Sequence, residues 1–337
     1  MNYSRSGSVP LYLAPMVTLT HAGLRHLIAE FGGCDRYYTE MISAEAITAH
    51  SAFHRWYLDL QPEPERTVYQ FLFRDAAAVK AVATKIAGRG ALGIDLNMAC
   101  SAPHIVRAGG GIAWMKRVDE ARRAVAAARE VLPDAHLSVK LRLGERREIE
   151  QLARFAVSLC AAGAGELTLH PKTRKEPEAR PADWRFVAEL QQRVAVPVVA
   201  SGGVSDITTL EYRIRRYEPR AVMIGREAVR SPWIFALARN AQLVIDRLAV
   251  ARRFGALLRE HQPPEFQLTR AKRFYQYYTQ PLQWGTRLFA ALKTARSMAE
   301  IEQRVGVYFA EHPQDRYPEP SRRQHAHTVP AAAAALQ

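Results

Sequence analysis

The sequence predicts an α/β protein, a (β/α)8 TIM barrel followed by a C-terminal all-helical region. Short β-rich segments alternate with longer helical patterns over the first 230 residues, which implies a parallel sheet with right-handed crossovers. Eight strand patterns within that length favour a closed barrel over an open sheet. From residue 227 onward the strand pattern stops and helical patterns follow.

Eight runs rich in apolar and β-branched residues are the expected strands. They lie at 11–14, 36–40, 67–72, 92–96, 136–141, 166–170, 196–200 and 221–224. Helical patterns separate most of them, at 20–31, 75–88, 118–131, 148–162, 183–194 and 206–217. The second crossover, 43–66, differs because a short helical stretch gives way to a loop that contains Pro62 and Pro64.

The C-terminal part is expected to form four helices. These are predicted at 233–260, 266–280, 282–294 and 297–309, with prolines separating the first two and the second two. We therefore predict a barrel domain over 1–235, a helical domain over 236–310 and a tail over 311–337. The tail is rich in proline and alanine and is expected to be mostly disordered.

Composition places the chain among cytoplasmic globular proteins. Of its 337 residues, 48% are hydrophobic and 24% charged, and no apolar run approaches the ~18 residues of a membrane helix. The N-terminus has no long apolar stretch, so we expect no secretory signal. The three cysteines are far apart, which predicts neither a disulfide framework nor a metal centre.

The charge balance predicts a polyanionic partner. The chain has 47 Lys and Arg against 33 Asp and Glu, a formal net charge of +14. Residues 236–337 hold 15 basic and 8 acidic residues, and residues 1–235 hold 32 and 25, so the last third is the more positive per residue. The alternative is an Arg-rich composition that only keeps the protein in solution.

Polar or reactive side chains follow nearly every predicted strand. In a (β/α)8 barrel the carboxyl ends of the strands meet at one rim, where catalytic groups gather. The residues placed there are Met16, Glu40, Gln70, Asn97, Cys100, Lys140, Arg142, His170, Lys172, Thr173, Ser201 and Arg226. A purely structural barrel has no need of such a set.

Two of these strand ends predict a phosphate site. Ser201-Gly202-Gly203 follows the seventh strand and Gly225-Arg226 follows the eighth. Glycines allow backbone N–H groups to approach an anion, and arginine adds charge-assisted hydrogen bonds. Barrels commonly bind phosphate at these two loops, although the glycines could instead serve only as tight turns.

The phosphate would belong to a cofactor or to a substrate, and the ring of such a cofactor would lie near Gln70, Lys140 and His170. A lysine beside a flavin stabilises the anion formed on reduction. Cys100 is placed like a catalytic group, since a thiol with a pKa near ~8.5 is protonated at neutral pH and can donate a proton. A nucleophilic role would require a base, and His104 is the nearest in sequence.

One helix of the C-terminal part combines basic and aromatic residues. Arg270, Arg273 and Tyr277 share a face at i, i+3 and i+7 spacing, whereas Phe274 and Tyr278 are expected in the core. Together with Lys272, this face is a candidate for binding RNA phosphates. The alternative is an ordinary solvated basic face.

These residues resemble those of the tRNA-dihydrouridine synthases. The resemblance rests on Asn97-Met98-Ala99-Cys100, on Leu13-Ala14-Pro15-Met16, on Val139 to Gly144, on His170 with Lys172 and Thr173, and on Gly225-Arg226. It covers about 11–235, and the helical part fits the family's plan. Ala99, Ser101, Pro171, Ser201 and Glu227 depart from the family's common residues.

The resemblance implies an FMN enzyme that reduces a uridine of tRNA to 5,6-dihydrouridine, with NADPH or NADH as electron donor. Hydride would pass from flavin N5 to uracil C6, and Cys100 would protonate C5. The implied FMN contacts are Pro15, Met16, Val17, Gln70, Lys140, His170, Ser201, Gly202, Gly203, Gly225 and Arg226. Asn97, Arg142, Lys172, Arg174, Arg270, Lys272 and Arg273 are expected to bind the substrate tRNA.

Two other functions remain open at the level of sequence. One is a flavin barrel that acts on a small pyrimidine or an enone, which the positive helical part disfavours. The other is a weakly catalytic RNA-binding paralogue that uses the barrel as a scaffold. A tRNA reader of this plan could work as a monomer.

Overall fold

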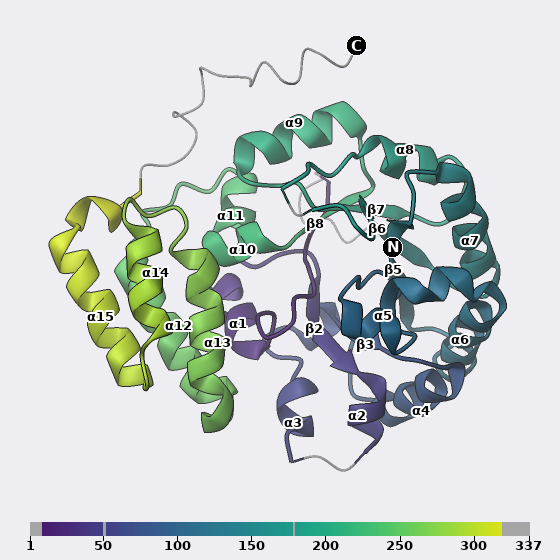
Figure 1. The fold of residues 1–337 in the computed structure, drawn as a ribbon, viewed down its shortest axis with the longest axis horizontal. Helices are drawn as coiled ribbons and strands as arrows, with labels where there is room; N and C mark the ends of the chain where they lie inside the picture. Colours follow the sequence, from purple (N-terminus) through teal and green to yellow (C-terminus); the bar gives the residue numbers. More distant parts are fainter. Residues whose placement is uncertain (1–8, 50–51, 178, 319–337) are drawn as a thin grey trace.

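Eight parallel strands form the centre of the molecule (Figure 1). The computed structural model describes residues 9–49, 52–177 and 179–318. The strands are β1 Leu11–Leu13, β2 Tyr37–Ser43, β3 Thr67–Leu72, β4 Gly93–Asn97, β5 His136–Gly144, β6 Glu166–Thr173, β7 Val198–Ser201 and β8 Ala221–Ile224. They pair in the order β1-β8-β7-β6-β5-β4-β3-β2, and a parallel bridge between Tyr12 and Arg36 joins the two ends. The predicted (β/α)8 barrel is confirmed.

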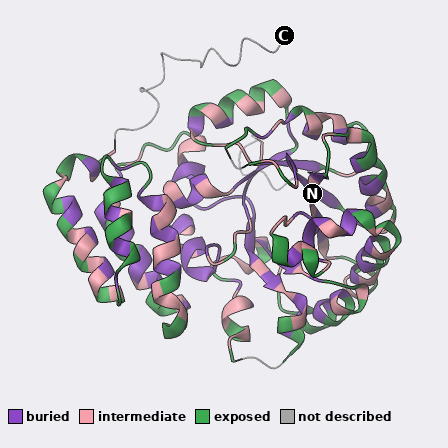
Figure 2. Cartoon of the chain, in the orientation of Figure 1, coloured by how far each residue is buried: buried purple, intermediate pink, exposed green. Residues whose placement is uncertain are grey.

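Helices surround this barrel on the outside. They are α1 Ala22–Glu30, α2 Ala44–Thr48, α3 His54–Tyr57, α4 Ala76–Ile86, α5 Pro103–Arg107, α6 Val118–Val131, α7 Ile149–Ala161, α8 Arg185–Gln191, α9 Ile207–Tyr217 and α10 Arg226–Arg230, with 3-10 turns η1 Pro64–Arg66 and η2 Gly111–Lys116. The carboxylates of Asp75 and Asp206 cap the first turns of α4 and α9. Figure 2 shows the buried strands at the centre and the exposed residues on the outer helical faces.

Strand residues alternate between two cores. One set of strand residues, which includes Leu13, Phe71 and Leu141, packs against the helices, whereas a smaller apolar cluster fills the barrel interior. That inner cluster consists of Tyr12, Ala14, Tyr38, Val68, Val199, Ala221 and Met223. At the amino ends of the strands, Arg36 pairs with Glu166 at 2.5 Å and fills this end of the barrel. The opposite, carboxyl-end rim is where the polar strand ends lie.

The C-terminal part consists of helices, as predicted, but one boundary differs. The helices are α11 Ile234–Ala238, α12 Arg247–His261, α13 Pro264–Tyr278, α14 Gly285–Lys293 and α15 Met298–Glu311. The single helix predicted over 233–260 is wrong, because Asn240 adopts a left-handed backbone conformation (φ 63°) and Asp246 caps the backbone N–H groups of Leu248 and Ala249. A new helix therefore begins at Arg247.

The ordered part of the chain extends past residue 311, where the disordered tail was predicted to begin. The 3-10 turn η3 Pro313–Asp315 follows α15, and the buried Asp315 accepts hydrogen bonds from the Gln283 backbone and the Tyr308 hydroxyl. Arg316 forms an ion pair with Asp246 at 2.6 Å. Asp315 and Arg316 thus hold this first part of the predicted tail against the helices, and the residues after 318 lie outside the described part of the chain.

The C-terminal helices pack against one flank of the barrel (Figure 1). Helix α12 contacts α1, and α13 contacts α10. A buried ion pair of 2.7 Å between Arg270 of α13 and Glu40 of β2 joins the two parts. Among the described helices, none is long and apolar enough to cross a membrane.

Candidate active site

A cavity of about 700 Å³ opens at the carboxyl-end rim of the barrel. It is bounded by the ends of β1, β5, β6, β7 and β8 and by α13. Ten of the eleven residues expected to contact the cofactor line it, all except Gln70: Pro15, Met16, Val17, Lys140, His170, Ser201, Gly202, Gly203, Gly225 and Arg226. Residues from five strand ends thus converge on one space.

The two glycines after β7 have the left-handed conformation that favours this residue type. Their φ angles are 87° at Gly202 and 78° at Gly203. A Cβ at Gly202 would lie 2.5 Å from Nε2 of His170, so the loop needs glycine for space as well. The Trp184 indole donates a hydrogen bond of 2.9 Å to the Gly202 carbonyl and fixes the loop. Backbone N–H groups can approach a bound anion closely here.

The cavity wall is strongly cationic. Among the described residues that line it, seven are lysine or arginine and none is aspartate or glutamate. The seven are Lys140, Lys172, Arg180, Arg213, Arg226, Arg230 and Arg273. Such a wall stabilises a multiply charged anion, and FMN carries a phosphate dianion.

Burial shapes the protonation states at the floor of the cavity. Burial and the neighbouring Arg142 lower the pKa of Lys140 to about 8, although Asp95 opposes this. Burial, followed by Lys140, lowers the pKa of His170 well below its ordinary value, so the imidazole is neutral near pH 7. Burial raises the pKa of Asp95 to about 6, while hydrogen bonds from Gln70 and Ser138 oppose it. The floor therefore carries a lysine whose charge is poorly compensated.

Asn97 shapes the loop that carries Cys100. Its side-chain oxygen accepts hydrogen bonds from the backbone N–H groups of Ala99 (3.2 Å) and Cys100 (2.9 Å). Its amide nitrogen donates to Gln70 at 2.9 Å, and Gln70 in turn donates to Asp95 at 2.7 Å. The Cys100 thiol is half-buried on this loop, directly after β4 and beside β5.

Comparison with known proteins identifies the family. The family model described as dihydrouridine synthase (Dus) matches residues 12–311. The chain belongs to the dihydrouridine synthase family. The resemblance seen in the sequence is thereby confirmed, and the chain belongs to a family of enzymes.

Named relatives agree with this family. A probable tRNA-dihydrouridine synthase of Rhodobacter capsulatus is 32% identical over 228 residues, which is 67% of this chain and 70% of the relative. The tRNA-dihydrouridine(16) synthase of Escherichia coli K12 is 26% identical over 305 residues, which is 87% of this chain and 96% of the relative. A 2-naphthoyl-CoA reductase complex is similar in fold alone, with a TM-score of 0.54, 10% identity and coverage of 68% of this chain and 50% of that chain.

The residues of this Dus chain that are expected to bind tRNA differ in their surroundings. Lys172 and Arg273 line the cavity. Arg142 donates to the Thr173 carbonyl at 3.2 Å, and Arg174 pairs with Glu145 at 2.7 Å. Lys272 is partly exposed on α13.

Arg270 does not lie on an exposed basic face, and that expectation is wrong. Only 3% of the residue is exposed, and its guanidinium pairs with Glu40, which comes from a distant part of the chain. The periodicity placed Arg270 and Arg273 on one side of α13, but the end that carries Arg270 packs against the barrel. Phe274 and Tyr278 are buried, as predicted.

Asp95 and Arg213 were not predicted as residues of this site. Asp95 lies two residues before Asn97 in β4, so strand alternation could have placed it inside the barrel. Arg213 of α9 also lines the cavity, and no local pattern signals this. Within the described residues, no group of three or more His, Cys, Asp or Glu could hold a metal ion.

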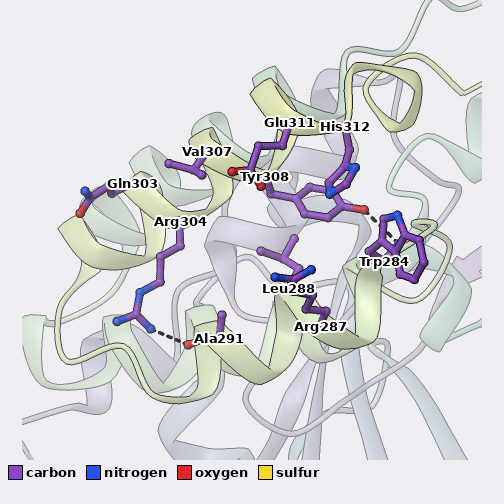
Figure 3. Close-up of a pocket in the computed structure, with 10 residues that line it drawn as sticks. All are labelled: Trp284, Arg287, Leu288, Ala291, Gln303, Arg304, Val307, Tyr308, Glu311 and His312. Atoms are coloured by element: carbon purple, nitrogen blue, oxygen red, sulfur yellow. Dashed lines mark hydrogen bonds between the residues drawn. The ribbon is translucent and has the colours of Figure 1, made fainter.

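A second hollow of about 320 Å³ lies between α14 and α15, far from these strand ends along the chain (Figure 3). Trp284 and His312 lie at one end of it, and Gln303 and Arg304 at the other. Arg304 donates hydrogen bonds to Ala291 and Thr294. None of the predicted site residues lines it, so the cavity at the barrel rim remains the candidate active site.

Proposed function

We propose that this protein is an FMN-dependent tRNA-dihydrouridine synthase that uses NADPH or NADH as electron donor. The observation that carries the proposal is the rim of the barrel, where a seven-cation cavity adjoins the loop of Cys100. Family membership supports the uridine substrate, because the relatives are named for this reaction.

The residues of the cavity fit an FMN molecule. The loop Ser201-Gly202-Gly203 and the pair Gly225-Arg226 would hold its phosphate, since both line the cavity and both offer donors for an anion. Lys140 and His170 would face its ring system. Bound and reduced flavin would supply a hydride to C6 of the uracil.

The chain's own residues would then complete the reduction. Lys140 is protonated below about pH 8 and supplies a positive charge opposite the anion that forms. Cys100 transfers its thiol proton to C5 of the uracil, and the resulting thiolate takes up a proton from solvent, so one hydride and one proton enter the base. Asn97 holds the loop that presents this thiol.

We also propose that tRNA lies across the rim and the C-terminal helices. A uridine within folded tRNA must leave its stack to reach the barrel, so a second surface is required to hold the rest of the RNA. Lys172, Arg174, Lys272 and Arg273 are the proposed phosphate contacts. This substrate places the protein in the cytoplasm.

Dihydrouridine mapping of tRNA tests the proposal. A strain that lacks the gene is expected to lose dihydrouridine at one position, and the wild-type gene restores it. Position 16 is the first to examine, because it appears in the name of the E. coli relative. A yellow protein whose loss leaves every dihydrouridine in place would instead indicate a small-molecule flavin enzyme, and a colourless protein would indicate an RNA-binding scaffold.

A further inference from the structure

We propose that Arg213 is a second phosphate-binding residue of the cofactor cavity, in addition to Arg226. The inference rests on the proposed function, since it assigns a role toward the FMN phosphate. Arg213 comes from α9, the helix that follows β7, whereas Arg226 follows β8. Two guanidinium groups from successive barrel units would then face one anion.

The guanidinium of Arg213 lies against the backbone of Gly203. A Cβ at Gly203 would be 2.8 Å from Nη2 and 2.9 Å from Cζ of Arg213. The missing side chain of Gly203 therefore leaves the space that this cation fills. Both residues line the cavity, and Gly203 belongs to the glycine loop proposed to hold the phosphate.

Three contacts hold Arg213 in this position. Its Nη1 donates a hydrogen bond of 3.0 Å to the Ala182 carbonyl. Its Cζ lies 5.1 Å from the centroid of the Trp184 ring, within the range of a cation–π contact. Because the same indole donates to Gly202, one tryptophan positions both the loop and the cation. The cation is thus held in place without a ligand.

Arg213 belongs to no ion pair in the described part of the chain, although Asp183 favours its charge from a greater distance. The nearby Asp183 is paired with Arg147 (2.7 Å) and Arg185 (2.8 Å). Burial lowers the pKa of Arg213, which means that its environment disfavours the charge. A bound dianion would offset this cost.

Phosphate is the ligand that fits this arrangement. A guanidinium presents five N–H donors in a plane, and only one hydrogen bond to protein is described for Arg213. Its fork suits two phosphate oxygens. We therefore expect Arg213 to favour FMN over riboflavin, which has the same ring system without the phosphate.

Binding of the two flavins to the apo-protein tests this role. We expect Arg213→Gln to weaken FMN binding about tenfold or more, measured by quenching of flavin fluorescence, because a charge-assisted hydrogen bond is lost. Riboflavin binding is expected to stay within about twofold of wild type. Arg216→Gln removes the same charge from the exposed face of α9 and should change neither value.

Gly203→Ala is a second, independent variant. Its Cβ would lie 2.8 Å from Nη2 of Arg213 and would displace the guanidinium from this position. We expect it to lose the preference for FMN while circular dichroism and the melting temperature confirm a folded protein. It also serves as the test if Arg213→Gln fails to fold.

The outcomes separate this inference from the proposed function. If wild type prefers FMN and both variants keep that preference, Arg213 does not bind phosphate and only this inference fails. If Arg213→Gln weakens both flavins equally, Arg213 is a structural support for the loop, and the inference again fails alone. If wild type binds neither flavin, the proposed function fails as well.

Discussion

Lys140 shows how single residues at the rim are prepared for a ligand. It lies inside the barrel, where burial lowers its pKa to about 8, and it is still charged at pH 7. Its partial counter-charge, Asp95, has a raised pKa and is already hydrogen-bonded by Gln70 and Ser138. The buried charge of Lys140 therefore carries a free-energy cost that an anionic ligand would relieve.

Lys140→Met is expected to stabilise the apo-protein while abolishing dihydrouridine formation. Removal of a poorly compensated buried charge should add on the order of 1–3 kcal/mol to the free energy of unfolding at pH 7, or a few degrees in melting temperature. The folded pKa lies below the unfolded one, so the gain is fully present below pH 8 and fades as the pH rises toward ~10.5.

Melting curves of the two apo-proteins at pH 7 and at pH 10 measure this difference. Lys116→Met is the matched control, because its side chain is 73% exposed. A variant that melts below wild type at pH 7 would show that Lys140 is well compensated.

Cys100 allows the chemical step to be separated from cofactor binding. Cys100→Ala is expected to keep its flavin and the reduction of that flavin by NADPH, because the thiol does not line the cofactor cavity. Dihydrouridine formation should fall by ~10²-fold or more, the scale of a general acid. Cys160→Ala serves as the control. Wild-type turnover of the Cys100→Ala variant would contradict the assignment.

At the scale of elements, the loop after β4 depends on a neighbouring turn. Gly111 begins η2 with φ 58°, and a Cβ there would lie 2.2 Å from the Cys100 carbonyl. The Ile112 backbone N–H also donates to that carbonyl at 3.0 Å. The 3-10 turn thus supports the cysteine loop from behind.

Gly111→Ala is expected to displace Cys100 and to reduce dihydrouridine formation about tenfold or more, with flavin retained. Gly88→Ala provides a close control, since Gly88 also has a left-handed φ (76°) and nothing lies within 4 Å of its added Cβ. Both variants incur the backbone strain, of the order of 1 kcal/mol, but only the first meets a steric clash. Equal activities would show that the turn does not position Cys100.

Local sequence patterns predicted the strands, whereas the ends of several elements depend on features that these patterns do not show. Runs of apolar and β-branched residues located all eight strands, because each strand buries apolar side chains against the helices. The break between α11 and α12 was missed, since the apolar pattern runs on while the left-handed Asn240 interrupts the helix and the cap at Asp246 begins a new one. Strands β5 and β6 extend to Gly144 and Thr173, so Arg142 and Lys172 lie in strands. Pairing between the two neighbouring strands extends both of them, and the spacing of residues in the sequence does not reveal this pairing.

At the scale of the whole molecule, the barrel and its site could be predicted from the sequence, whereas the contact between the barrel and the C-terminal helices could not. The glycine loops and Lys140 come together because barrel topology brings strand ends to one rim. Arg270 pairs with a carboxylate that lies 230 residues away, and no periodicity on α13 reveals this. Arg273 lines the cavity for the same reason, because α13 packs against the barrel.

The basic face of α13 is consequently smaller than the sequence predicted. Lys272→Gln together with Arg273→Gln is expected to flatten the slope of log affinity for tRNA against log salt by ~1–2 units, about one unit per phosphate contact. Arg122→Gln with Arg123→Gln on α6, on the opposite flank of the barrel (Figure 1), should leave the slope unchanged. An unchanged slope in the α13 variant would direct the search for RNA contacts to Lys172 and Arg174.

The carboxylate of Glu40 links the C-terminal helices to the loop after β1. One of its oxygens accepts the guanidinium of Arg270, and the other accepts the backbone N–H of Thr18, which belongs to the loop after β1 beside Val17. This carboxylate therefore joins the C-terminal helices to the mouth of the barrel and favours one distance between them. Under the proposed function, a tRNA bound by the C-terminal helices would present to the barrel only the nucleotide at that distance. The position of the reduced uridine would thus be set by its distance from the RNA contacts on the C-terminal helices, and the bases around it would not be read.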